Sequence, residues 1–447
     1  MSTRIIGIDL AVTAAHKAAI LDPATNRYVV KQMTFRTSPA ELDKLLRRAR
    51  HGAGDNPEII VVLEATSLAW HPVSLYLQQH GAKLYRVNGR MTKRMRHVRY
   101  PHARSDRLDC QVLATLYNAY PSKLDPLYIP TGEEMTLQRA CREFVRYREA
   151  ITAIDNRLTA YENWAWLGLT RLIPARALNW MRTEWYDPWD VTTAGIATLR
   201  SAWLQQPASK NDDCAWLQPW LQRAEALTQL LPSREAIDYP ALVSSTKRAL
   251  AQRACLSEEQ DDLFKTVIAP LYRRLFPDCQ LTSLYGVGEQ SAAIYMAFIH
   301  SIDRFPTVDS FRQWTGMVPA SDQSGNTQSK GLGITQAGPN IVKATLFLDA
   351  HVARRYDPQL AAIYYKQMVL YGKHYTQAIC VVASHLANRI YALLKENRAY
   401  ELRDLDGEPI SSSDARALIE ERFLVPAEVR RRTSKHVRRD PQPAPAP

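Results

Sequence analysis

The chain has 447 residues, of which 46% are hydrophobic, and it carries a formal net charge of +12. This length exceeds one small domain and predicts two or three. The excess of Lys and Arg points to a polyanionic partner, of which nucleic acid is the commonest. A membrane surface is the weaker candidate, because no apolar run approaches the roughly 20 residues that a spanning helix needs. The amino terminus leads directly into a predicted strand without a signal peptide, so we expect a cytoplasmic protein.

The six cysteines lie far apart, with no CxxC pair and no His at zinc-binding spacing. We therefore expect reduced and mostly buried thiols, without disulfides and without structural zinc.

Residues 1–127 alternate between apolar strand patterns and helix patterns. Three strands come first (RIIGIDLA, HKAAILD and RYVVKQMTF), and a helix follows (SPAELDKLLRRAR). The pattern continues as strand (EIIVVLEAT), helix (HPVSLYLQQHG), strand (AKLYRVN) and a last helix from Ser105. Three successive strands followed by alternating helices and strands are the element order of an RNase H-like α/β fold. We predict such a domain here, with a mixed sheet covered by helices.

Residues 130–165 keep a heptad-like spacing of apolar side chains. Steps of three and four residues separate Leu137, Ala140, Phe144, Tyr147, Ile151, Ile154, Leu158 and Tyr161. This repeat predicts a long helix in a coiled coil. A core helix that packs within its own domain is an equally good interpretation.

Residues 166–275 form a predicted helical insert that is rich in tryptophan. Eight of the ten tryptophans lie in or beside it: Trp164, Trp166, Trp180, Trp185, Trp189, Trp203, Trp216 and Trp220. Aromatic side chains among arginines can stack on bases. More often they are the large residues of a small core, and we favour that interpretation.

Residues 276–400 are predicted to form a compact C-terminal domain. It opens with LTSLYGVGEQSAAIYMAFI, whose GVG resembles the turn of a helix-hairpin-helix motif that can hold a phosphate. A Gly/Ser/Gln-rich loop and two apolar helical segments follow. Residues 401–447 are predicted to be a basic, Pro/Ala-rich tail. We expect its end, VRRRTSKHVRRDPQPAPAP, to be disordered and to grip nucleic acid.

Two predicted strands end in a carboxylate, Asp9 on the first and Glu64 on the fourth. For Asp9 alone, a structural residue at a strand end is the simpler interpretation. An RNase H-like sheet, however, places the two strand ends side by side, and Asp106 and Asp109 share one face of the domain's last helix. Such like charges are unfavourable together unless a cation binds them, and Mg²⁺ prefers carboxylate oxygens. We therefore predict that these four residues hold Mg²⁺ for phosphoryl transfer.

A basic segment lies beside these acids. No acidic residue occurs between Glu64 and Asp106, whereas the segment carries Arg86, Arg90, Lys93, Arg94, Arg96, Arg99, Arg104 and Arg107. Cations for a phosphate backbone beside carboxylates for a metal are what cleavage of a phosphodiester requires. We favour this interpretation over a merely solvated basic face.

The loop 321–338 contains Ser324 directly before Gly325. A serine hydroxyl becomes a good nucleophile only when another group activates it. The loop alone is therefore a weak indication of catalysis.

Together these segments resemble the insertion sequence 110 family of transposases, which are DNA recombinases. The resemblance runs from GIDLA through LEATS and SDRLD, and from LYGVG through GMVPASDQSGNTQSKGLGITQAGPN toward Leu393. It implies a RuvC-like N-terminal domain, a coiled coil and a C-terminal transposase domain. Its DEDD metal site would fall on Asp9, Glu64, Asp106 and Asp109, and its nucleophilic serine on Ser324.

The resemblance also implies a reaction and partners. Ser324 would attack the scissile phosphate, the carboxylates would come from another protomer, Mg²⁺ would balance charge, and strand exchange would follow. The partners would be donor and target DNA and a bridge RNA from the element, held by a homodimer that assembles into a tetramer in a bacterium or archaeon. The residues expected to hold nucleic acid are Arg86, Arg90, Lys93, Arg94, Arg96, Arg99, Arg104 and Lys330.

Two features depart from the family pattern. The region 164–275 is longer and richer in Trp than the family's linker, so its role is unassigned. Lys330 and GPN stand where more Arg and a GN are usual.

Three other functions stay open. A junction resolvase or nuclease that uses the four carboxylates with water as nucleophile would not need Ser324. An actin-like ATPase or sugar kinase also opens with GID, but AVTAAHK lacks the Gly/Thr-rich turn that holds phosphates there. A nucleic-acid-binding protein with structural acids would function without metal.

Overall fold

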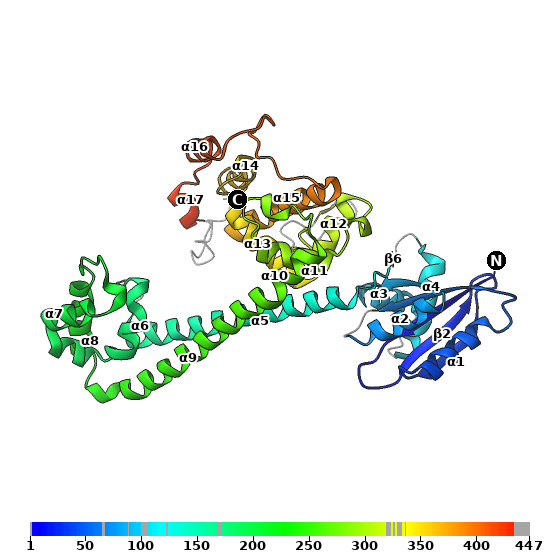
Figure 1. Ribbon diagram of the computed structural model, residues 1–447, viewed down its shortest axis with the longest axis horizontal. Coiled ribbons are helices and arrows are strands. Elements are labelled where there is room, and N and C mark those ends of the chain that lie inside the picture. The colour runs from blue at the N-terminus through cyan, green and yellow to red at the C-terminus, as the bar shows by residue number, and fades with distance from the viewer. Residues whose placement is uncertain are drawn as a thin grey trace, which may run out of the picture. The chain divides into compact units, whose positions relative to one another are not determined.

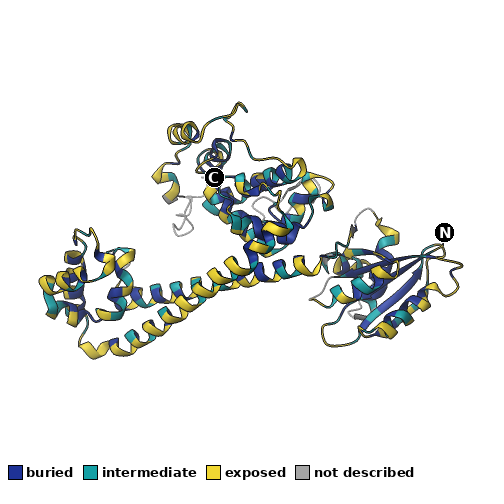
Figure 2. Ribbon diagram, viewed as in Figure 1, coloured by how far each residue is buried: buried dark blue, intermediate teal, exposed yellow. Residues whose placement is uncertain are grey.

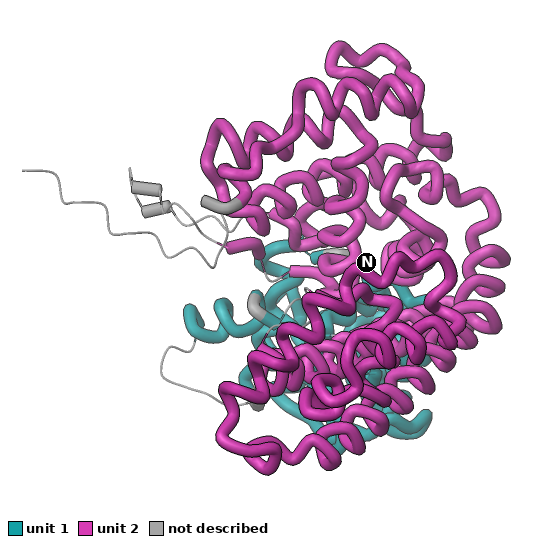
Figure 3. Tube along the Cα trace, turned by 90° about the vertical axis from the view of Figure 1, so that its left-hand side faces the viewer, with its two compact units in different colours: residues 1–131 teal, residues 132–447 magenta. Residues whose placement is uncertain are grey.

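The computed structural model describes residues 2–64, 68–87, 89–99, 106–121, 124–167, 172–318, 323–324, 327–328, 333–335 and 337–432. The chain divides into two compact units, which Figure 3 colours separately. Unit 1 comprises Met1–Thr131 and unit 2 comprises Gly132–Pro447.

Unit 1 is built on a six-stranded mixed sheet in the order β3-β2-β1-β4-β5-β6. β1 pairs antiparallel with β2 and parallel with β4, and β4 pairs parallel with β5. The unit is therefore an α/β domain in which β1 to β5 follow the predicted order of strands. The helix Gly89–Arg99, which lies within the predicted basic segment, and the short β6 were not predicted from the sequence. The strands are β1 (Thr3–Asp9), β2 (His16–Asp22), β3 (Arg27–Phe35), β4 (Glu58–Glu64), β5 (Lys83–Val87) and β6 (Asp125–Pro126).

Helices cover both faces of this sheet (Figure 1). α1 (Pro39–Arg50) and α2 (Trp70–Gln79) share one core with Ile6 and Ile8 of β1. α4 (Asp106–Ala119) shares the other core with Ile5 of β1, and α3 (Gly89–Arg99) packs against that second core. Successive residues of a strand point to opposite faces, so β1 is buried on both sides, as its dark colour in Figure 2 shows.

The helix α4 lies directly against β1 at Gly7. A Cβ atom on Gly7 would lie 2.2 Å from the carbonyl oxygen of Cys110 and 2.3 Å from the amide nitrogen of Ala114. Only glycine permits this approach, because it has no Cβ atom. Gly7, which lies two residues before Asp9, therefore sets the position of α4 on the sheet.

Unit 2 is almost entirely helical in the residues that the structure describes. Two short strands, β7 (Gln323–Ser324) and β8 (Thr327–Gln328), pair with each other. Short 3-10 and π segments connect several helices. The helices are α5 (Gly132–Ala165), α6 (Ala175–Glu184), α7 (Pro188–Leu204), α8 (Leu217–Leu230), α9 (Tyr239–Leu263), α10 (Ala269–Leu275), α11 (Glu289–Ile299), α12 (Val308–Thr315), α13 (Asn340–Ala353), α14 (Pro358–Tyr365), α15 (Tyr375–Glu396), α16 (Ser412–Arg422) and α17 (Ala427–Arg432).

The long helix α5 lies alongside α9 of the same chain (Figure 1). An ion pair joins Arg253 Nε of α9 to Asp155 Oδ1 of α5 at 2.7 Å. The first half of the predicted heptad seam enters the C-terminal core, and its second half packs on α9 through Ile154, Leu158 and Ala249. These contacts match the interpretation of a helix that packs within its own chain. A coiled coil between two copies stays a prediction.

The tryptophan-rich region has its own hydrophobic core, which runs from the end of α5 through α6, α7 and α8 to the start of α9. Trp166, Trp203 and Trp220 are fully buried, whereas Trp164 is 59% exposed. The ring of Trp180 has centroid distances of 5.2 to 6.4 Å to four other indole rings, those of Trp185, Trp203, Trp216 and Trp220. The tryptophans therefore serve mainly as core residues, the interpretation that the sequence favoured.

A buried carboxylate ties this core together. Asp212 accepts hydrogen bonds from the indole nitrogens of Trp203 at 2.8 Å and Trp216 at 3.1 Å and from the amide of Cys214, and it pairs with Arg176 at 3.0 Å. Burial by itself would raise the pKa of Asp212, but these partners outweigh it and lower the pKa to about 2.

The C-terminal part of unit 2 has one large core, built from α5, α10, α11, α13, α14 and α15. The turn before α11 packs on α13 at Gly286, which has a φ of 89°, and a Cβ atom there would lie 2.6 Å from the carbonyl oxygen of Asp349. Of the described helices, α15 is long and apolar enough to cross a membrane, which the sequence analysis did not expect. Half of its apolar stretch is buried in this core, so it is weak evidence for a membrane.

The predicted tail from residue 401 contains two helices, α16 and α17, and buries Leu402, Ala415 and Val425. The helix α17 reaches into the stretch that was predicted to be disordered, which begins at Val429. Val425 joins the large C-terminal core. Charged residues make up 14 of the 32 positions in 401–432, so the few apolar residues gave little indication of a fold. Residues 433–447, with the Pro/Ala-rich end of the predicted tail, lie outside the described residues.

Replacing Asp212 by Ala tests the role of this carboxylate. Because its folded-state pKa lies below its ordinary value of 3.8, it stabilises the fold above about pH 4, and this stabilisation is lost as the pH falls through about 2. We expect the variant to lose about 2 kcal/mol of unfolding free energy in the tryptophan-rich region at pH 7, and progressively less below pH 4. Tryptophan fluorescence during urea unfolding measures this, with Glu225→Ala on the exposed face of α8 as control. An equal loss at pH 3 and pH 7 would contradict it.

Replacing Gly7 by Ala tests the approach of α4 to β1. Overpacking of this kind costs about 1–3 kcal/mol, so hydrogen exchange in β1 and α4 should accelerate about five- to 100-fold in the full chain. In Gly132→Ala, where no atom lies within 4 Å of an added Cβ, exchange should not accelerate. Unchanged exchange in the Gly7 variant would contradict the close packing.

Candidate functional site

Asp9 and Glu64 end two adjacent parallel strands. The β1/β4 register pairs Ile8 with Leu63, so Asp9 and Glu64 occupy the next positions, on strands about 4.8 Å apart. Both residues have the parity of Ile5 and of Val62, which belong to the core beneath α4. The two carboxylates therefore point to the face of the sheet that α4 covers.

The helix α4 brings Asp109 to the same face. Burial and then the charge of Asp109 raise the pKa of Glu64, while Lys93 of α3 opposes this rise. Burial also raises the pKa of the Cys110 thiol to about 11, and the Asp9 carboxylate adds to that effect. Asp109 is therefore close enough to Glu64 to raise its pKa, and Asp9 is close enough to Cys110, the neighbour of Asp109 on α4, to raise the pKa of that thiol.

Asp106 begins α4, one turn before Asp109. Its backbone is therefore at the same end of the helix, but its side chain lies outside what the structure describes. Three of the four predicted metal ligands can thus be placed by their side chains, and all three share one face of the sheet.

The helix α3 covers these carboxylates. Arg96 Nη1 of α3 donates to both carboxylate oxygens of Asp109, at 2.9 and 2.7 Å. Gly89 at the start of α3 lies against Glu64, because a Cβ atom there would be 2.4 Å from Glu64 Oε1. The helix α3 can therefore lie against Glu64 because Gly89 has no side chain, and it is held to Asp109 by Arg96.

The described side chains do not form a closed metal site. Among them, no group of three or more His, Cys, Asp or Glu side chains lies close enough to hold a metal ion. Asp109 is paired with Arg96 instead. The residue types nevertheless fit Mg²⁺, which takes carboxylate oxygens and keeps several waters.

The predicted nucleic-acid-binding residues divide into exposed, paired and undescribed side chains. Arg86 on β5 and Lys93, Arg94 and Arg99 on α3 are exposed. Arg96 is only 22% exposed in its side chain, because it pairs with Asp109. The side chains outside the described residues are those of Arg90, Arg104, Arg107 and Lys330.

Ser324 ends the short strand β7 in unit 2, and its side chain lies outside what the structure describes. The base of its loop is held closed, since Thr335 donates its backbone N–H to Val318 and its hydroxyl to Gly316. Gly338 packs directly on the backbone of Trp314 with a φ of 67°. Beside this base lies a pocket of about 330 Å³ whose lining includes Thr335, Asn340, Lys343 and Cys380.

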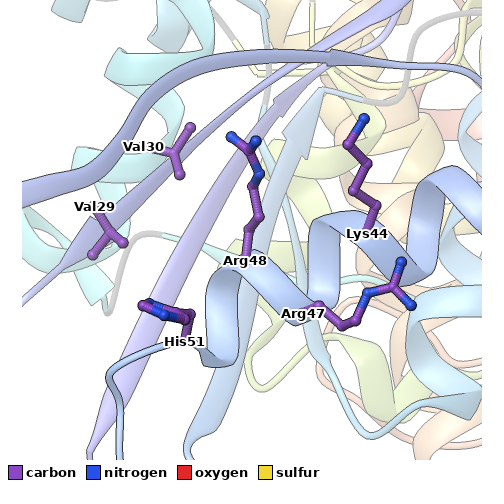
Figure 4. Close-up of a pocket in the computed structure, with 6 residues that line it drawn as sticks. All are labelled: Val29, Val30, Lys44, Arg47, Arg48 and His51. Carbon is purple, nitrogen blue, oxygen red and sulfur yellow. The ribbon is translucent and has the colours of Figure 1, made fainter.

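A second pocket, of about 470 Å³, lies between β3 and the last turns of α1 (Figure 4). Its walls carry Lys44, Arg47, Arg48 and His51 above two valines of β3. It belongs to the α1 side of the sheet, whereas Asp9 and Glu64 face α4. Cations in a last turn also complement the helix dipole, which accounts for this basic wall.

The sequence indicated Asp9, Glu64 and Asp109 but not the residues that arrange them. Nothing in the sequence distinguishes Gly7 and Gly89 from the other glycines, or Arg96 from the other arginines of the basic segment. One feature of the sequence could have indicated the pairing of Arg96. Because no acid occurs between Glu64 and Asp106, the cations of α3 have no acidic partner within that stretch and are left to pair with the carboxylates beyond its ends.

The two ends of the chain match known families of transposases. Residues 6–161 match a transposase family of the DEDD type of insertion sequence 110, and residues 279–365 match the transposase family of insertion sequences 116, 110 and 902. A Streptomyces coelicolor protein, the insertion element IS110 uncharacterized 43.6 kDa protein, is 24% identical over 412 residues, which are 89% of this chain and 95% of that protein. Between the two family matches lie residues 162–278 with the tryptophan-rich core. The chain belongs to the insertion sequence 110 family of transposases.

Proposed function

We propose that this transposase cuts and joins DNA strands by Mg²⁺-dependent phosphoryl transfer, with Ser324 as the nucleophile. The observation that carries the proposal is the position of Asp9, Glu64 and Asp109 on one face of the sheet, at the adjacent ends of β1 and β4. Carboxylates in such a group are unfavourable without a cation, so they support a metal site.

The fold of unit 1 is consistent with this chemistry. Strand order β3-β2-β1-β4-β5, with β2 antiparallel and β4 parallel to β1, is what an RNase H-like or RuvC-like domain requires. In that assignment Asp9, Glu64, Asp106 and Asp109 are the four DEDD residues. Mg²⁺ bound there would neutralise charge on the phosphate and on the leaving oxygen.

The residues of the chain would act around that ion. Exposed cations of α3, Lys93, Arg94 and Arg99, would hold the phosphate backbone next to the carboxylates. Ser324 Oγ would lose its proton and form a bond to phosphorus, while the bond from phosphorus to the sugar oxygen breaks and that oxygen takes up a proton. The product is a covalent phosphoserine. Attack by a sugar hydroxyl of a second strand would then release Ser324 and complete the exchange.

The carboxylates belong to unit 1 and the serine to unit 2. The family resemblance implies that they come from different protomers, so we propose a homodimer that assembles into a tetramer on donor and target DNA. The same resemblance implies a bridge RNA from the element, whose base pairing selects the DNA. The net charge of +12 supports such polyanionic partners.

A recombination assay tests the proposal. It combines purified protein, RNA from the flank of the element, and donor and target DNA, and it compares the wild type with Ser324→Ala and Asp9→Asn. We expect each variant to lose at least about 100-fold in product formation, because each removes a group that acts on the reacting phosphate. A covalent protein–DNA adduct should form only when Ser324 is present. Ser321→Ala, in the same loop, is the matched control and should retain activity.

A different result would identify a different enzyme. If Ser324→Ala still cut DNA while Asp9→Asn did not, the protein would be a metal-dependent junction resolvase or nuclease that uses water as nucleophile. If both variants recombined DNA at the wild-type rate, neither group would belong to the active site.

A further inference from the structure

Arg96 is the counter-ion of Asp109. It is bound to both carboxylate oxygens of Asp109, and the two side chains are only 22% and 19% exposed. A guanidinium that donates to both oxygens satisfies the carboxylate as a metal ion would, with one positive charge instead of two. The metal-free chain therefore already has a counter-ion at Asp109.

The helix α3 has an inner and an outer face, and Arg96 lies between them. Met91 and Met95 pack into the core beneath α4 and anchor the helix. Lys93, Arg94 and Arg99 are exposed and available to phosphates. A guanidinium also donates charge-assisted hydrogen bonds to phosphate oxygens. A nucleic acid held on the outer face of α3 therefore competes with Asp109 for Arg96.

We propose that Arg96 holds Asp109 in the metal-free chain and moves to nucleic-acid phosphate when a strand binds α3, so that Asp109 becomes available to the metal. Arg96 is thus a positioning residue that couples nucleic-acid binding to metal binding. This inference rests on the proposed function, since it takes Asp109 as a metal ligand. The guanidinium and a divalent cation need the same carboxylate oxygens and repel each other, so they exclude each other. Because binding free energies are linked, nucleic acid and metal then strengthen each other's binding by the same factor.

The first test measures Mn²⁺ binding to the metal-free full chain by calorimetry, without nucleic acid. Removing the competitor in Arg96→Gln should tighten Mn²⁺ binding about three- to fivefold, the scale expected for a partly exposed ion pair. Arg48→Gln makes the same charge change on α1, at the other face of the sheet, and should bind Mn²⁺ as the wild type does. Equal or weaker binding by Arg96→Gln would overturn the inference.

The second test adds a 20-base-pair DNA duplex. In the wild type and in Arg48→Gln the duplex should tighten Mn²⁺ binding by a similar three- to fivefold. In Arg96→Gln it should add nothing, because Asp109 is already released. A duplex effect of the same size in Arg96→Gln would overturn the inference. Arg96→Lys, which keeps the charge but replaces the planar guanidinium by an ammonium group, should lie between the wild type and Arg96→Gln, and thermal unfolding checks that all variants are folded.

Asp9→Asn separates this inference from the proposed function. If that variant and the wild type bind Mn²⁺ equally, the proposed metal site is wrong and the inference falls with it. If Asp9→Asn loses Mn²⁺ binding while Arg96→Gln behaves as the wild type, the metal site stands and only the role of Arg96 is wrong.

Discussion

The contact between α4 and β1 at Gly7 is the constraint on which the candidate site depends. The backbone of the helix rests on the backbone of the strand, with Cys110 and Ala114 where a side chain would otherwise be. Since Asp9 follows two residues later on the same face, any shift of α4 changes the distance from Asp9 and Glu64 to Asp109. A glycine in a central strand thus sets the geometry of a group of acids that it does not itself contact.

Nearby cations offset part of the charge of these acids. Asp109 has Arg96, and Lys93 favours the charged form of Glu64 against the effects of burial and of Asp109. The chain follows the same rule elsewhere, since Asp212 in the tryptophan-rich core is ionised by virtue of its hydrogen bonds and Arg176. The two carboxylates, Asp109 and Asp212, differ in where their partners lie. Asp212 has its hydrogen-bond partners within one folded core, whereas Arg96 stands next to a surface that suits phosphates.

The sequence predicted the strands β1 to β5 and the helices α1, α2 and α4, and each of these strands is an apolar run. It did not predict α3, because the residues of that helix stand out in the sequence only as a basic run. Asp9 and Glu64 followed from the same pattern, since an acid at the end of a buried strand is conspicuous. The contacts of Arg96 and Gly89 could not be predicted, because they depend on how α3 docks, and nothing in the basic run distinguishes one arginine from the next. The fold of residues 401–432 was missed because a few apolar anchors decide it, while charge dominates the composition. The heptads of α5 predicted a packed helix but not its partner α9.

A crystal structure of the full chain with Mn²⁺, located by anomalous diffraction, tests the metal site and its link to Arg96 together. We expect a peak about 2.1 Å from carboxylate oxygens of Asp9 and Glu64, completed by an acid of α4, with Arg96 no longer bound to Asp109. This expectation would be contradicted by saturating Mn²⁺ that leaves the ends of β1 and β4 without a peak and Arg96 still paired with Asp109.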